Sequence, residues 1–177
     1  MTTKRFKNIL LLVLFMSVVS SHRAIAQEPL HEVKGQPVAA AFSLLDIDDN
    51  MHSLAAYKGK IVIVNFWATW CPPCRFELPS MEKAYQKLKA EDVVMLGINV
   101  GEDADTIFSF TADYPVTFPL LLDRDSKVTQ AYPVIGLPTT FVIGPNGRII
   151  YRAVGTREWD EQVLIEKVLA LKKRSGH

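Results

Sequence analysis

The apolar positions of this chain form continuous runs in some segments and recur at helical spacing in others, and this pattern predicts strands alternating with helices. Residues 61–67 form an apolar run rich in β-branched and aromatic side chains, interrupted only by Asn65. Such a run is typical of a central strand that is covered on both faces. Residues 93–100 predict a second buried strand. Between these strands, apolar residues recur at helical spacing, which predicts a helix from about residue 71 to residue 90.

The remaining pattern predicts a small hairpin near the N-terminus, two short helices, three more strands and a final amphipathic helix. A Gly-Pro-Asn-Gly sequence at 144–147 joins the last two strands and is a strong hairpin signal. We therefore expect an α/β layer fold in which a mixed central sheet is flanked by helices. The expected ranges are 42–45 with 53–54 for the hairpin, 106–114 and 127–132 for the short helices, 120–122, 140–143 and 148–154 for the strands, and 159–173 for the final helix.

The first 26 residues have the order of a secretory signal peptide. Three basic residues lie within the first seven positions, residues 9–19 are apolar apart from Ser17, and an Ala-Ile-Ala sequence ends at Ala26. The apolar run is shorter than the ~20 residues that span a bilayer. We expect cleavage after Ala26, export to the periplasm and no stable membrane insertion. An uncleaved N-terminal anchor in the inner membrane, with the protein facing the periplasm, is the alternative.

The expected division of the chain is a signal peptide at 1–26, a linker at 27–36 and one domain at 37–177. The first 26 residues carry four basic residues and no acidic residue, so the rest of the chain has 16 basic and 19 acidic residues and a net charge of −3. This balance provides no electrostatic basis for binding nucleic acid or an anionic membrane surface.

The chain contains only two cysteines, Cys71 and Cys74, separated by Pro72 and Pro73. A structural disulfide in an exported protein usually closes a longer loop, so the spacing indicates redox chemistry or metal binding. No further cysteine is present to complete a tetrahedral zinc site, and we expect neither a metal nor a cofactor. At a helix N-terminus the free N–H groups and the macrodipole favour a thiolate on Cys71, which would attack a disulfide. Cys74, about one turn deeper, would then resolve the mixed disulfide.

Two segments, 59–74 and 136–141, resemble the thioredoxin superfamily, and within it the exported TlpA/ResA-like thiol–disulfide oxidoreductases. The first contains Trp-Cys-Pro-Pro-Cys and the second is Gly-Leu-Pro-Thr-Thr-Phe. The resemblance covers about residues 37–172. It implies a thioredoxin-like fold with an extra helix and strand inserted at about 104–122.

The resemblance also implies a substrate groove beside the cysteine pair. The bond between Leu137 and Pro138 would be cis, Pro138 would face the cysteines, and a backbone edge would remain open for an extended peptide. Trp70, Pro72 and Pro73 would line the same groove. From the residues alone, Pro138 would be assigned as a trans proline at the start of a strand, and the resemblance reverses that assignment.

Family members place an acidic residue three positions after the second cysteine, and Glu77 occupies that position here. Residues three apart share a helix face, so partial burial would make Glu77 a proton acceptor for Cys74. The alternative is a solvated first-turn glutamate favoured by the helix dipole. Cytosolic thioredoxins carry a buried Asp at the position that Asn65 occupies here. The amide of Asn65 takes up no proton at working pH, unlike that Asp.

The implied function is the reduction of protein disulfides in the periplasm, with thiols of apocytochrome c as one client. Electrons would arrive from a membrane donor of the DsbD/CcdA type. A thiol oxidase or isomerase that uses the same pair is one alternative, and a Cu(I) carrier is another because soft thiolates select Cu(I). The sequence has no His-rich or Met-rich cluster near the pair, and around Cys71 it lacks the Pro-x-x-x-Thr-x-x-Cys pattern of a peroxidase.

Overall fold

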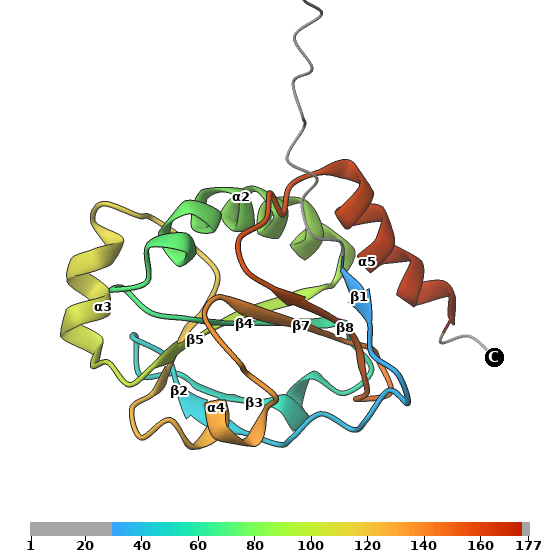
Figure 1. The fold of residues 1–177 in the computed structure, drawn as a ribbon, viewed down its shortest axis with the longest axis horizontal. Coiled ribbons are helices and arrows are strands. Elements are labelled where there is room, and N and C mark those ends of the chain that lie inside the picture. Colours follow the sequence, from blue (N-terminus) through green and yellow to red (C-terminus); the bar gives the residue numbers. More distant parts are fainter. Residues whose placement is uncertain (1–29, 175–177) are drawn as a thin grey trace, which may run out of the picture.

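The computed structural model describes residues 30–174 as one mixed sheet between two layers of helices and turns (Figure 1). The expected signal peptide and its cleavage site lie outside the described residues. The six strands follow the order β1-β8-β7-β4-β5-β6. Strands β4, β5 and β6 are mutually parallel, and β7, β8 and β1 add antiparallel pairs. The bounds are β1 His31–Glu32, β4 Val62–Trp67, β5 Val94–Val100, β6 Leu120–Asp123, β7 Thr139–Ile143 and β8 Ile149–Val154.

Helices cover the sheet unequally on its two faces (Figure 1). Helices α2 and α5 lie on one face, and the short helix α4 and the hairpin β2–β3 lie on the other. Helix α3 packs into the same apolar cluster as α2 through Ile107. Within the described residues, no helix has the length and apolar character needed to cross a membrane. The bounds are α2 Pro72–Leu88, α3 Ala104–Thr111, α4 Lys127–Ala131, α5 Gln162–Arg174, β2 Ser43–Leu45 and β3 Met51–Ser53, with short 3₁₀ helices at Leu54–Tyr57 and Lys89–Glu91.

The predicted fold class is confirmed, and β4 is the strand on which it depends. All six residues of β4 are buried, as its unbroken apolar run predicts. Two apolar clusters form the core, one on each face of the sheet, and residues that alternate along β4 divide between them. Ile63 and Trp67 belong to the cluster under α2, whereas Val64 and Phe66 belong to the cluster on the opposite face.

The final helix begins later than expected, at Gln162 instead of residue 159. Trp159 is only 2% exposed, and its backbone N–H donates to the Ser80 hydroxyl of α2 at 3.0 Å. The indole is therefore packed into the core from an irregular segment that precedes the helix and is docked on α2. Helical periodicity identifies the α5 face correctly but does not reveal this docking contact.

The described part of the expected linker, residues 30–36, packs against the domain. Strand β1 pairs with β8 in the register His31 to Arg152 and Glu32 to Tyr151. Leu30 is 2% exposed, and its carbonyl accepts a hydrogen bond from Lys167 Nζ at 2.8 Å. This short strand continues the sheet beyond β8 and shields part of an edge that would otherwise be open to pairing.

Replacement of Gly97 in β5 by alanine is expected to destabilise the protein. An added Cβ would lie 2.9 Å from Leu120 Cδ2 and 3.1 Å from both Phe118 Cε2 and Trp67 Nε1. Overpacking of this kind lowers the unfolding free energy by about 1–3 kcal/mol. Urea denaturation measures the loss, with Gly136→Ala as control because no atom lies within 4 Å of its added Cβ. Equal stability of the two variants would contradict the packing argument.

Candidate active site

The two cysteines lie where β4 passes into α2. Four residues separate the end of β4 from the first residue of α2, and the Cys71 N–H donates to the Ala68 carbonyl across this turn at 3.3 Å. Cys71 is the N-cap residue in an extended conformation, and prolines occupy the first two helical positions, where a backbone N–H is not required. The Cys71 Sγ accepts the Cys74 backbone N–H at 3.3 Å. The sulfur therefore lies at the positive end of the helix, which favours its thiolate form.

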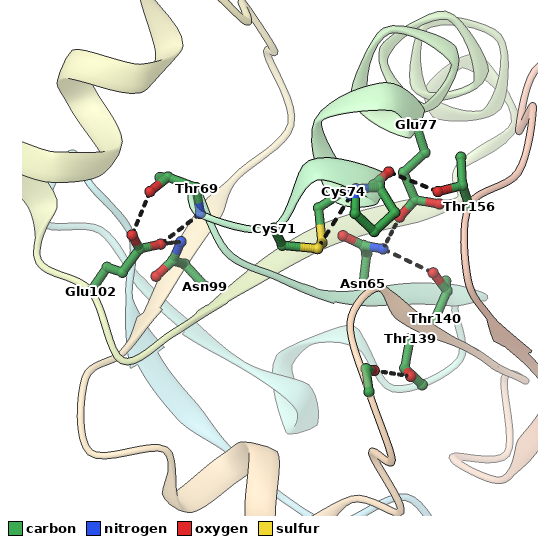
Figure 2. The surroundings of a disulfide bond; sticks show 12 residues. Asn65, Thr69, Cys71, Cys74, Glu77, Asn99, Glu102, Thr139, Thr140 and Thr156 are labelled. Atoms are coloured by element: carbon green, nitrogen blue, oxygen red, sulfur yellow. Dashed lines mark hydrogen bonds between the residues drawn. A yellow bond between two sulfur atoms is a disulfide. The ribbon is translucent and has the colours of Figure 1, made fainter.

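A disulfide joins Cys71 to Cys74, with their Cα atoms 5.3 Å apart (Figure 2). Cys71 retains 3% of its surface and Cys74 none, so the first cysteine is the less buried of the two. Both cysteines are thus buried in the oxidised form. Three apolar side chains from neighbouring segments are well exposed, namely Trp70, Phe76 and Ile135 at 65%, 75% and 76%. A macromolecular partner would bury apolar area when it approaches Cys71.

The peptide bond between Leu137 and Pro138 is cis, as the resemblance implies. Pro138 immediately precedes β7, and the first β7 residue, Thr139, pairs with Phe66 near the end of β4. The Pro138 carbonyl accepts the Gly155 N–H at 2.9 Å, and the Thr139 hydroxyl donates to the Gly136 carbonyl at 2.6 Å. The register thus brings the proline loop to the end of the sheet from which the cysteine turn leaves.

Glu77 is buried beneath the first turns of α2 and is 1% exposed. Its two carboxylate oxygens accept hydrogen bonds from Asn65 Nδ2 at 2.8 Å and from the indole N–H of Trp159 at 3.1 Å (Figure 2 shows the first). Burial raises the pKa of Glu77 to about 7, although these bonds and the nearby Arg157 act in the opposite direction. The geometry therefore favours the buried alternative for Glu77 over the solvated one.

Several polar partners of this site were not expected from the sequence. Asn65 Nδ2 also donates to the Thr140 hydroxyl at 2.9 Å, and the Thr156 hydroxyl donates to the Pro73 carbonyl at 2.8 Å (Figure 2). These residues lie 75 and 83 positions from their partners, so no local pattern could pair them. Asn65 thus contributes more than strand hydrogen bonding, because it links the buried carboxyl to the neighbouring strand β7.

No cluster of three or more His, Cys, Asp or Glu residues is arranged to hold a metal within residues 30–174. His52 contacts Asp46 and Tyr57, at 2.9 and 2.5 Å, and these residues belong to the β2–β3 hairpin and the 3₁₀ turn that follows it. Among the described residues, a soft metal bound by the two cysteine sulfurs would find no cluster of further ligands beside them.

Known proteins match this chain over most of the described domain. The model of the AhpC/TSA family matches residues 35–152. The thiol-disulfide oxidoreductases ResA of Bacillus subtilis (strain 168) and of Geobacillus kaustophilus (strain HTA426) are both 42% identical over 118 residues. These alignments cover 67% of this chain and 66% and 68% of the two relatives, so the chain spans about two thirds of their length.

Two solved structures show the same fold. A putative thiol:disulfide interchange protein DsbE from Chlorobium tepidum superposes with a TM-score of 0.71 at 29% identity, covering 81% of this chain and 99% of that one. A putative protein disulfide isomerase from Bacteroides thetaiotaomicron superposes with a TM-score of 0.72 at 26% identity, covering 82% and 95%.

The raised pKa of Glu77 predicts a stability that falls as pH rises. In the unfolded chain the carboxyl ionises near 4.5, whereas in the folded protein it ionises at about 7. Below 4.5 both states are protonated, and between these values only the unfolded state is ionised, so the unfolding free energy decreases by about 3 kcal/mol across the window. Glu77→Gln lacks this contribution.

The measurement is the difference in unfolding free energy between the oxidised wild type and Glu77→Gln at pH 4.5–8. Glu82→Gln is the control, because the Glu82 pKa is lowered by hydrogen bonds and its difference should stay level over this range. Parallel curves for the wild type and Glu77→Gln would show that the Glu77 pKa is not raised.

Proposed function

The chain belongs to the AhpC/TSA family and is a thiol–disulfide oxidoreductase, and from this premise we propose that it reduces protein disulfides in the periplasm. The observation that carries the proposal is the arrangement at the start of α2. The less buried of the two cysteines, Cys71, caps the N-terminus of the helix, and a carboxyl with a pKa of about 7 is buried one turn beyond Cys74. This arrangement supplies both a nucleophile and a proton acceptor near neutral pH.

The proposed reaction passes two electrons from the dithiol to a client disulfide. The Cys71 thiolate attacks one client sulfur, the client S–S bond breaks, and the leaving client thiolate takes up a proton. Ionised Glu77 then accepts the proton of the Cys74 thiol. The Cys74 thiolate attacks Cys71 Sγ, which releases the second client sulfur and leaves the disulfide that the structure contains.

The client is proposed to bind as an extended segment along the loop that ends at Pro138. That loop contributes exposed Ile135, and the turn before Cys71 contributes exposed Trp70. Extended peptides add to open backbone edges, with side chains providing specificity. Leu137, Pro72 and Pro73 complete the proposed groove. Apocytochrome c thiols before haem attachment are a suitable client, because they must stay reduced in an oxidising compartment.

Export and a membrane electron donor complete the proposal. The basic, apolar and small-residue order of the first 26 residues supports export. An exported reductant has no direct access to cytosolic electrons, so it needs a membrane donor, and the family resemblance supports one of the DsbD/CcdA type.

A second candidate function is disulfide isomerisation or oxidation with the same two cysteines. It is favoured by one observation, the fold shared with a putative protein disulfide isomerase at 26% identity. The redox state of the pair in cells distinguishes the two functions, since a donor is kept mostly reduced and an oxidant mostly disulfide-bonded. For the Cu(I) carrier, metal analysis of anaerobically prepared protein is the corresponding test.

We expect a reduction potential of about −270 mV, close to that of thioredoxin and far from the −120 mV of DsbA. Pro72 and Pro73 supply no N–H to the Cys71 thiolate, and no histidine lies between the cysteines to stabilise it. The reduced form is therefore not unusually stabilised. Equilibration of the purified protein with glutathione measures the potential, and a value above about −180 mV, that of protein disulfide isomerase, would rule out the reductant function.

Substitution of the second cysteine should trap clients. In Cys74→Ala the mixed disulfide on Cys71 cannot be resolved, so covalent complexes should accumulate and can be identified by mass spectrometry. In Cys71→Ala the remaining thiol is fully buried, so the amount of trapped client should be at most about one tenth of that in Cys74→Ala. Equal trapping of the same clients by both variants would show that Cys71 is not the nucleophile.

A further inference from the structure

A second carboxylate, that of Glu102, contacts the turn that carries Cys71. Its two oxygens accept three hydrogen bonds, from the Thr69 backbone N–H at 2.8 Å, from the Thr69 hydroxyl, and from Asn99 Nδ2 at 2.7 Å (Figure 2). Charge-assisted hydrogen bonds of this kind are about twice as strong as neutral ones. Two of the three donors belong to Thr69, which lies two residues before the nucleophile.

Glu102 is itself held by the rigid end of β5. Asn99, one of its partners, is fully buried and pairs in register with Trp67, the last residue of β4. The preceding Gly101 has a φ of +80°, and its N–H donates to the Asp123 carbonyl of β6 at 3.0 Å. The carboxylate thus fastens the turn after β4 to the ends of two neighbouring strands.

We propose that Glu102 is a positioning residue, which holds the turn at residues 68–71 so that Cys71 keeps its attacking geometry. This inference rests on the proposed function. The contact matters most in the reduced protein, because the disulfide that ties Cys71 to Cys74 in the oxidised form is then absent. The turn is then held by its Cys71-to-Ala68 hydrogen bond and by Glu102.

The chain offers a matched control for the bonds that Glu102 makes. Glu82 accepts the backbone N–H and the hydroxyl of Thr117, both at 2.7 Å. It is a partly exposed side chain like Glu102. Glu82 lies eight positions after Cys74 in α2, which is about 12 Å along the helix axis. Glu82→Ala therefore removes the same kind of carboxylate–threonine contact away from the disulfide.

The test measures the rate at which chemically reduced protein cleaves insulin disulfides in a single turnover, from pH 5 to pH 9. Glu102→Ala should lower the plateau rate constant roughly tenfold, since a displacement of about 1 Å can cost up to 100-fold. Glu82→Ala should lower it less than about twofold, with a similar loss of thermal stability in both variants. Thr69→Val should lower the rate in the wild-type background and have little further effect in Glu102→Ala.

Glu102→Gln separates position from charge. It keeps one acceptor oxygen without the negative charge, so positioning predicts a plateau between those of the wild type and Glu102→Ala, with the pH midpoint nearly unchanged. A lower pH midpoint with an unchanged plateau would mean that Glu102 acts through charge alone, and would overturn the inference. Equal plateau rates for Glu102→Ala and Glu82→Ala would also overturn it. Failure of the proposed function would look different, because reduced wild-type protein would then leave insulin disulfides intact.

Discussion

The passage from β4 to α2 is the constraint on which the active site depends. A strand buried on both faces ends at Trp67, and α2 starts at Pro72. Only four residues connect them, so the first sulfur is forced to the N-terminus of the helix. At that position the sulfur accepts the Cys74 backbone N–H and lies at the positive end of the helix macrodipole. The nucleophile is thus created by chain geometry, and the residues around it adjust its proton affinity, access and position.

A carboxyl buried beneath the second cysteine is costly, and the fold compensates for part of that cost. Desolvation disfavours ionised Glu77, while hydrogen bonds from Asn65 and Trp159 favour it. The balance leaves a pKa of about 7, which suits a group that must both accept and release a proton. Trp159 reaches the carboxyl from the segment before α5, which is docked on α2 through Ser80. The packing of the C-terminal segment therefore contributes directly to the chemistry at the N-terminus of α2.

The parts of this site that could be predicted are those encoded locally. The unbroken apolar run of β4 and the two cysteines after it are sufficient to place the sulfur at a helix start. The burial of Glu77 depends on a tryptophan 82 residues away, and the Glu102 contact spans 33 residues. Such pairs form only once strand order and register are set, and the sequence pattern does not specify them. Residues 30–36 show the same limit, since breaker residues predict a loose segment but not its pairing with β8.

Helix α3 and strand β6, which the family resemblance implies as an insertion, are connected to the active site. Gly101 and Glu102 lie at the junction of β5 and α3, and the Gly101 amide bonds to the last residue of β6. Parallel strands have their carboxyl ends at the same end of the sheet, and functional groups commonly lie there in such folds. In this protein Thr69 follows β4, Glu102 follows β5, and Asn99 is the penultimate residue of β5. The third parallel strand thus supports the loop that in turn supports the nucleophile.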